Sequence, residues 1–231
     1  MTSRRLVVPV GALAVVLTTL AVVGVFAVAP EDADQGIIQK IFYFHTSIAL
    51  GSLVAFAVAF AAAIRYLWTR SALADEVSSI SIGIGLLYTV LTVITGSIWA
   101  KASWGHWWVW GDPRLVTYLI VVLLYAAYFV LRSSLEGERR MRYSAVYAVV
   151  AFASVPLSFY SVRVAQSFVH PVVFTRNGAN LPGSMLIWFV VSQAAVLAIF
   201  ATFLLLELEQ RRADRALRRL KLRLEALEPV A

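Results

Sequence analysis

The stretch Ile80–Trp99, ISIGIGLLYTVLTVITGSIW, decides the fold, because its 20 consecutive residues include no charged side chain. A helix of about 20 residues is long enough to cross the hydrocarbon core of a bilayer, which is about 30 Å thick. Apolar stretches of comparable length occur at six places in the chain, and each predicts a membrane-spanning helix. The six predicted spans are Leu6–Ala29, Ile37–Ile64, Ile80–Trp99, Leu115–Leu131, Tyr143–Tyr160 and Ser184–Leu206.

The composition of the whole chain agrees with these spans. Of its 231 residues, 61% are hydrophobic and 14% are charged, against roughly 45–50% and 25% in soluble globular proteins. With a mean hydropathy of +0.80, this composition excludes both a soluble fold and an intrinsically disordered chain. Because the apolar runs are continuous rather than alternating, we predict an all-α integral membrane protein and not a membrane β-barrel.

The distribution of Lys and Arg predicts the orientation of the spans. Fifteen of the 20 basic residues fall at the two termini and in the even-numbered connections, and five fall in the odd-numbered ones. By the positive-inside rule, both termini are then cytoplasmic and the odd-numbered connections face outward. The net charge of +7 is therefore interpreted as a mark of topology and not of nucleic-acid binding. The five outward basic residues are Lys40, Lys101, Arg114, Arg163 and Arg176.

The first span has a second possible interpretation. Its basic start, its apolar run and the sequence Ala27-Val28-Ala29 are similar to a secretory signal with its cleavage site. The apolar run exceeds 20 residues, whereas the apolar region of a signal peptide has about 7–15. Pro30 also directly follows the position of cleavage. We therefore predict a retained membrane helix.

The chain ends in a segment of different character. Residues 207–231 are rich in arginine and carry an apolar stripe at spacings of four and three residues, which is typical of a basic amphipathic helix. We predict one six-helix membrane domain, residues 1–206, followed by this cytoplasmic tail. The tail either extends the sixth helix and lies on anionic lipid or forms a docking surface for a partner helix. Its apolar stripe is Ala213, Leu217, Leu220, Leu224 and Leu227.

The three histidines of the chain, His45, His106 and His170, all fall toward the predicted outer face. Taken singly, an interfacial histidine can serve only to hydrogen-bond a carbonyl group or water. An ionisable residue within a membrane segment, however, indicates a functional site, and His45 is the clearest instance.

The outward connection Ala100–Arg114, AKASWGHWWVWGDPR, is here called the tryptophan loop. It holds four of the seven tryptophans within seven residues, namely Trp104, Trp107, Trp108 and Trp110. Tryptophans that anchor helix ends at a membrane surface usually occur singly, as Trp68 and Trp188 do. Four in one loop favour a platform for a flat, hydrophobic ligand.

Haem fits these features. Two histidines from different outward segments can take the two axial positions of an iron porphyrin, and the outward cations Lys101, Arg114, Arg163 and Arg176 can meet its propionates. The chain contains no cysteine, which excludes thiolate metal sites and covalent attachment of haem to this chain.

The same residues resemble a known family. The segment Gln39–His45, QKIFYFH, the segment Trp104–Leu115, WGHWWVWGDPRL, and the lone His170 before the last span are similar to the CcmC family, the haem exporter protein C of cytochrome c maturation. CcmC belongs with CcmF and CcsA among haem-handling proteins that carry a tryptophan-rich, WWD-type loop. The resemblance covers about half of the chain, and the first span and the tail add nothing specific to it.

The resemblance implies a bacterial inner-membrane protein that binds haem b non-covalently on its outer face. His45 and His170 would be the axial ligands of the iron, and no role is carried over to His106, which falls at a variable position. One departure from the family pattern is Gly111, which separates the last tryptophan of the loop from Asp112. A tight turn at Gly111 and Pro113 can restore the direction of the Asp112 carboxylate. The other haem-binding residues implied are Trp104, Gly105, Trp107, Trp108, Trp110, Asp112 and Arg114.

The resemblance also implies partners and a transfer function rather than an enzyme. Haem would be delivered to CcmE, a membrane-anchored haem chaperone, in a complex with the ATP-hydrolysing CcmA, the membrane subunit CcmB and the small protein CcmD. The chain has no Walker-type phosphate loop, so any dependence on ATP has to come from a partner.

Three alternatives remain at this point. The first is a component that attaches haem to apocytochrome c, although such relatives are longer and have more histidines. The second is an electron-transfer cytochrome, which usually needs histidines toward both faces of the membrane. The third is a transporter subunit in which the tryptophans serve only as a membrane anchor.

Overall fold

The computed structural model describes residues 2–164, 174–175, 178–179 and 181–226. Within these ranges the chain is helical apart from its connections, an isolated bridge between Asp32 and Gly36 and one two-residue antiparallel ladder. The elements are α1 (Thr2–Ala27), a 3-10 turn η1 (Ile37–Lys40), α2 (Ile41–Thr69), α3 (Ala72–Trp104), α4 (Pro113–Ser133), α5 (Gly137–Ala151), α6 (Ser154–Val164), β1 (Phe174–Thr175), β2 (Gly178–Ala179) and α7 (Gly183–Glu225).

Six helical segments in the described residues are long and apolar enough to cross a membrane, which confirms the predicted fold class. The fifth segment, predicted as one helix over Tyr143–Tyr160, is divided between α5 and α6 at Phe152 and Ala153. Pro156 explains this break, because proline lacks an amide N–H and its ring conflicts with the carbonyl four residues earlier, that of Phe152. In α6 the proline occupies the first turn, where no hydrogen bond is lost.

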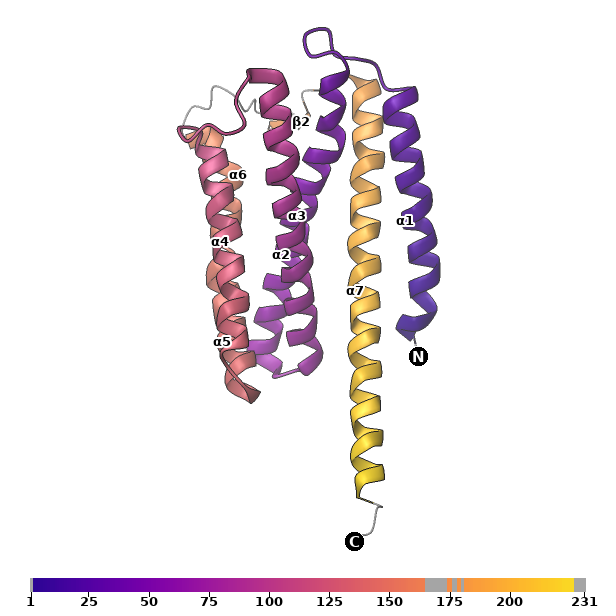
Figure 1. The fold of residues 1–231 in the computed structure, drawn as a ribbon, viewed down its shortest axis with the longest axis vertical. Helices are drawn as coiled ribbons and strands as arrows, with labels where there is room; N and C mark the ends of the chain where they lie inside the picture. The colour runs from indigo at the N-terminus through magenta and orange to yellow at the C-terminus, as the bar shows by residue number, and fades with distance from the viewer. Residues whose placement is uncertain (1, 165–173, 176–177, 180, 227–231) are drawn as a thin grey trace.

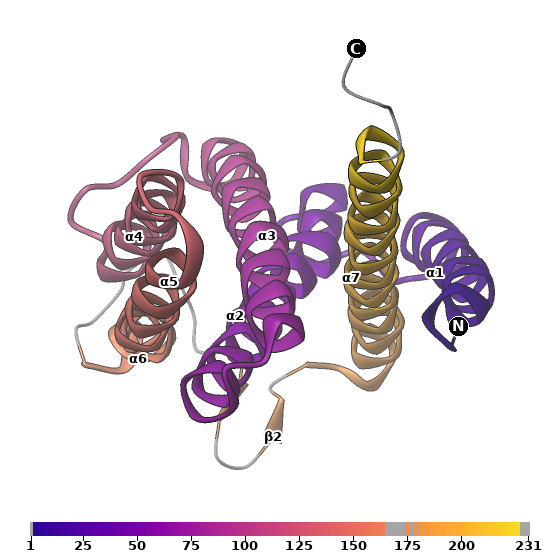
Figure 2. The ribbon, with the colours of Figure 1, turned by 90° about the horizontal axis from the view of Figure 1, so that it is seen from below.

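The helices form two groups on either side of a central pair. Helices α2 and α3 lie side by side in the middle, α4, α5 and α6 pack on one side, and α7 with α1 packs on the other (Figures 1 and 2). In the core, the rings of Phe56 and Tyr125 stack 3.8 Å apart. Gly85 makes room for this stack, because a Cβ atom there would lie 2.7 Å from the Phe56 ring.

Helix α1 packs along α7. The two helices approach closely at Gly24, where a Cβ atom would overlap the ring of Trp188. Thirteen residues earlier in α1, Gly11 lies near Thr202 with ordinary spacing. A glycine at position 24 is therefore what lets the two helices meet.

The third helix extends beyond its predicted span, Ile80–Trp99, at both ends. It begins at Ala72 and continues to Trp104, so the first part of the tryptophan loop is helical. Hydropathy detects only the part of a helix that crosses lipid, whereas backbone hydrogen bonding continues into the polar regions on either side. The extension at the N-terminal end is held by Asp75, which forms a bidentate ion pair with Arg132 of α4 at 2.7 and 2.8 Å.

The last helix, α7, continues without a break into the predicted tail. Its 43 residues correspond to a rod about 65 Å long, and the part beyond Leu206 keeps the direction of the spanning part (Figure 1). The tail therefore extends the sixth predicted span as one continuous helix. It also contacts α3, because Arg211 donates a hydrogen bond to Ser79 and Arg215 forms an ion pair with Glu76.

Candidate functional site

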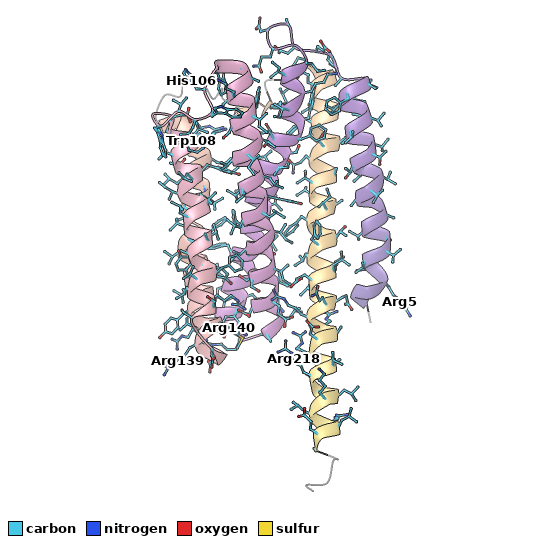
Figure 3. All side chains as sticks on the ribbon, viewed as in Figure 1. Arg5, His106, Trp108, Arg139, Arg140 and Arg218 are labelled. Carbon is cyan, nitrogen blue, oxygen red and sulfur yellow. The ribbon has the colours of Figure 1, made fainter. Side chains whose placement is uncertain are left out.

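The predicted site residues that the structure describes gather at one end of the helix bundle, here called the loop end. His45 lies in the second turn of α2, the tryptophan loop joins α3 to α4, and α6 ends and α7 begins at the same end (Figure 1). The opposite end, which carries both termini, is called the tail end. Figure 3 shows His106 and Trp108 at the loop end and Arg5, Arg139, Arg140 and Arg218 at the tail end.

His45 is held between α2 and α3. Its Nδ1 atom lies 3.0 Å from Thr95 Oγ1, and its ring meets that of Trp99 edge to face at 5.7 Å. The Thr95 hydroxyl donates its own hydrogen to the Leu91 carbonyl at 2.8 Å, so its oxygen accepts from His45 Nδ1–H. This hydrogen bond places the lone pair of the neutral imidazole on Nε2, as in a metal-ligating histidine.

The absence of a side chain at Gly96 is a condition for this placement of His45. A Cβ atom at position 96 would lie 2.8 Å from His45 Cε1, closer than side-chain carbons approach one another in folded proteins. Threonine and glycine on one turn of α3 thus fix the imidazole from two directions.

Trp99 and Trp104 extend the aromatic surface beside His45 toward the loop. The Trp99 indole N–H donates to Gln35 Oε1 at 2.8 Å, and Ser103 donates to the same oxygen at 3.3 Å. The Trp99 and Trp104 rings are nearly parallel, with centroids 6.4 Å apart. Gln35 therefore joins the segment before η1 to the last turns of α3.

Gly105 ends α3 in the left-handed region, with φ +80°, a conformation that side chains with a Cβ atom disfavour. The Gly105 carbonyl accepts a hydrogen bond from Lys101 Nζ at 2.9 Å. Lys101 and Gly105, both predicted to contact haem, thus together form the C-terminal end of α3. The Lys101 ammonium is one of the cations that the sequence offered for propionates.

The non-helical part of the tryptophan loop, Gly105–Asp112, divides its three tryptophans by exposure. Trp107 and Trp110 are 58% and 72% exposed, whereas Trp108 is half-buried. The Trp108 and Trp110 rings meet edge to face at 5.7 Å. Although its indole Nε1 atom is fully buried, Trp108 has no acceptor for it among the residues that the structure describes.

Asp112 begins α4. Its carboxylate is buried, and Oδ1 accepts the backbone N–H groups of Arg114 and Leu115, both at 3.0 Å, which is the geometry of a helix N-cap. The predicted tight turn is present, because the Asp112 N–H donates to the Val109 carbonyl at 3.0 Å. Gly111 lies in this turn and has no neighbour that a side chain would meet.

Arg114 lies behind the loop and is partly buried. Its guanidinium donates from Nη2 to the Phe159 carbonyl of α6 at 3.4 Å. The Nε atom is buried and finds no acceptor within the described part of the chain. Two donors next to the tryptophan loop, Trp108 Nε1 and Arg114 Nε, are thus both removed from water and unpaired.

Other predicted residues are placed as follows. His106 is exposed in the loop, and Arg163 donates to the Phe159 carbonyl at 3.2 Å while lying over the Tyr160 ring. His170 and Arg176 lie outside the described residues, so the second axial ligand stays a prediction. Lys40, one of the outward cations, is buried and donates to the Phe26 carbonyl at 3.1 Å.

Three residues with a role at the site were not among those predicted: Gln35, Thr95 and Trp99. Part of the signal was present in the sequence, because Thr92, Thr95, Trp99 and Ser103 recur at spacings of three, four and four and so share one face of a helix. The partner of that face depends on the pairing of α2 with α3, which the spacing does not reveal.

Comparison with known proteins gives a consistent result. The model of the family described as "CcmC: Heme exporter protein C" matches residues 1–223. A protein named "Heme exporter protein C" from Bradyrhizobium diazoefficiens is 31% identical over 214 residues, covering 91% of this chain and 81% of the relative. Proteins of the same name from Escherichia coli K12 and Paracoccus denitrificans are 32% and 30% identical over 151 and 142 residues. These alignments cover 64% and 61% of this chain and 61% and 58% of the two relatives.

Proposed function

Because the chain belongs to the haem exporter protein C family, whose members handle haem in cytochrome c maturation, we propose that it binds haem at the loop end and transfers it to a haem chaperone. The acceptor is a membrane-anchored chaperone of the CcmE type. The haem is haem b, held without a covalent bond, and it is the cargo of the protein rather than a resident cofactor. The protein is not an enzyme in this proposal.

The observation that carries the proposal is the pair of unpaired donors beside the tryptophan loop. Leaving a buried donor without an acceptor costs about 1–3 kcal/mol, and more for a charged group. Trp108 Nε1 and Arg114 Nε are both buried donors without an acceptor among the described residues. A porphyrin propionate is an anionic acceptor of the kind that an arginine and an indole N–H satisfy. We infer that the propionates of haem meet this pair.

His45 supplies an axial ligand to the iron in this proposal. Its Nε2 atom carries the lone pair, since Nδ1–H donates to Thr95. We retain His170 as the second ligand on the basis of the family resemblance.

The loop suits temporary binding of a flat molecule. Trp107 and Trp110 are exposed by more than half of their surface, so a porphyrin that rests on them keeps one edge accessible. An accessible edge permits a chaperone to take up the haem without opening the helix bundle. The other partners proposed are the CcmA and CcmB subunits and a CcmD-type small protein, with ATP hydrolysis supplied by CcmA.

Titration of the purified protein with haem tests the site. The His45→Ala variant should lose the Soret band of bound haem or bind haem at least about ten-fold more weakly. The matched control is His106→Ala, which removes an exposed histidine of the same end. Equal haem affinity in wild type and His45→Ala would overturn the axial assignment.

A second assay tests the transfer step. Haem-loaded protein is mixed with an affinity-tagged CcmE-type chaperone, and the haem in each fraction is measured after separation. Haem should move to the chaperone, whereas haem that stays with this chain at all chaperone concentrations would contradict a delivery function.

A further inference from the structure

A cleft of about 820 Å³ opens at the tail end, far from the tryptophan loop. Its walls come from the start of α3, from the end of α4 and the start of α5, and from the part of α7 beyond the membrane span. Seven arginines line it, against three carboxylates, Asp75, Glu76 and Asp214. The cleft therefore has a strong excess of positive charge.

Some of these arginines form the walls of the cleft. Arg132 pairs with Asp75 across α4 and α3, and the side chains of both are largely buried. Arg215 pairs with Glu76 and joins α7 to α3. Arg211 and Arg212 pair with Glu207 and Glu209 along α7 itself. In each pair the two charges neutralise each other. The Arg215–Glu76 pair and the Arg211–Ser79 hydrogen bond hold α7 against α3, and the Arg132–Asp75 pair holds α4 against α3.

Three arginines of the cleft have guanidinium groups without an ion pair or hydrogen bond to the described residues: Arg140, Arg218 and Arg219. Arg140 comes from α5 and the other two from α7, so the charges belong to different walls of the cleft; Figure 3 labels Arg140 and Arg218. Asp214 is the one carboxylate of the lining that forms no ion pair with the residues the structure describes. Cations on different walls of one cleft are suited to an anion placed between them.

We propose that this cleft binds a phosphate group, carried by the headgroup of an anionic phospholipid or by a small soluble phosphate. The planar guanidinium groups match the oxygens of a phosphate. The cleft begins at the level of Ser79 and Arg211, directly before the apolar span that starts at Ile80, which is the level of lipid headgroups. Its rim includes the exposed apolar side chains of Leu73 and Leu222, which suit an acyl chain.

Haem does not fit this cleft as well as a phosphate does. No histidine and no aromatic residue lies among its lining residues, so neither an axial ligand nor a stacking surface is offered. The cleft is therefore a second, chemically different site and not an extension of the loop end. The proposal does not depend on the haem-binding function.

Native mass spectrometry of the purified protein in mixed micelles of phosphatidylglycerol and phosphatidylcholine tests the proposal. Wild type should retain phosphatidylglycerol in preference to phosphatidylcholine. The double variant Arg140→Gln/Arg218→Gln should retain about ten-fold less, since each basic residue near a membrane surface contributes to the binding of anionic lipid. The matched control is Arg139→Gln/Arg223→Gln, which removes the same charge from the same two helices outside the cleft.

The source of the phosphate is distinguished by a second arm with radiolabelled inorganic phosphate in place of lipid. Loss of phosphatidylglycerol in the cleft variant alone supports a lipid headgroup. Binding of free phosphate by wild type that is lost only in the cleft variant supports a soluble phosphate. Equal behaviour of the two double variants in both arms, or no binding by wild type in either arm, overturns the proposal. Gel filtration checks that all variants remain folded.

Discussion

The imidazole of His45 shows how one residue depends on its neighbours. Without Thr95, its ring nitrogens could exchange their roles, and either of them could carry the proton. The hydroxyl at 3.0 Å selects one tautomer, and Trp99 restricts the ring from the side. The chemical property of the histidine is therefore set by residues on another helix.

A substitution of Thr95 measures this effect. Thr95→Val removes the acceptor for Nδ1–H at nearly constant volume, and we expect haem affinity to fall by about ten-fold, as is usual when a ligating histidine loses its hydrogen-bond partner. Thr95→Ser keeps the hydroxyl and should bind haem nearly as wild type does. Both affinities are read from the Soret band in a haem titration. Equal affinities in Val and Ser variants would show that Thr95 does not orient the ligand.

Asp112 offers a second test at this scale, because its observed role is that of a helix cap. Asp112→Ala should lower the free energy of unfolding by about 1 kcal/mol, the usual cost of a lost N-cap. Asp112→Asn caps equally well, so we expect wild-type stability and wild-type haem affinity. Thermal unfolding in detergent and haem titration give the two quantities. A strong loss of haem affinity in Asp112→Asn alone would instead show that the negative charge itself serves haem binding.

At the scale of helices, contacts between neighbours depend on single glycines. Helix α1 exposes most of its surface, and its packing partner is mainly α7. The two helices are in close contact where Gly24 meets Trp188. The stability of the first helix in the bundle therefore depends on a position that hydropathy does not distinguish from its neighbours.

Two glycine substitutions on α1 separate packing from helix propensity. Gly24→Ala places a methyl group inside the Trp188 ring, and we expect a loss of about 1–3 kcal/mol in the free energy of unfolding. In Gly11→Ala the new Cβ lies 3.6 Å from Thr202, an ordinary contact, so stability should stay equal or rise slightly through the higher helix propensity of alanine. Thermal unfolding followed by tryptophan fluorescence provides the comparison. Identical unfolding of the two variants would contradict the packing of α1 on α7.

For the whole molecule, the two ends differ in charge and in chemistry. His45 and the four tryptophans of the tryptophan loop lie at the loop end, with His106 and Trp108 labelled there in Figure 3, and Arg5, Arg139, Arg140 and Arg218 lie at the tail end. The positive-inside rule predicts that the tail end is cytoplasmic. This sidedness is a property of the molecule in its membrane and calls for a measurement in cells.

The lack of cysteine makes the measurement direct, because a single introduced thiol is the only target for a maleimide reagent. In intact cells, His106→Cys at the loop end should react with a maleimide that does not cross the inner membrane. Arg223→Cys on the tail should react only after that membrane is permeabilised. The unsubstituted protein serves as the blank. The reverse pattern would show that the orientation derived from charge is wrong.

The sequence predicted those features of the fold that follow from the thickness of the lipid layer, namely the membrane-spanning helices. Apolar length identified all six spans, but it missed the helical turns beyond the membrane, such as Ala72–Ser79, and the break before Pro156. In the site, the residue types of His45 and the tryptophans were sufficient to suggest a flat ligand. The partners that orient them, Gln35 and Thr95, could not be predicted, because they depend on which faces of α2 and α3 meet.

Helix α7 has a mechanical consequence. From Ser184 to Glu225 it contains neither glycine nor proline, and its length of about 65 Å exceeds the lipid thickness of about 30 Å roughly two-fold. Continuous backbone hydrogen bonds make such a rod resistant to bending and compression. A displacement imposed on its tail-end part therefore reappears at Gly183, at the same end as the tryptophan loop (Figure 1). Force can pass from one side of the bilayer to the other along this helix alone.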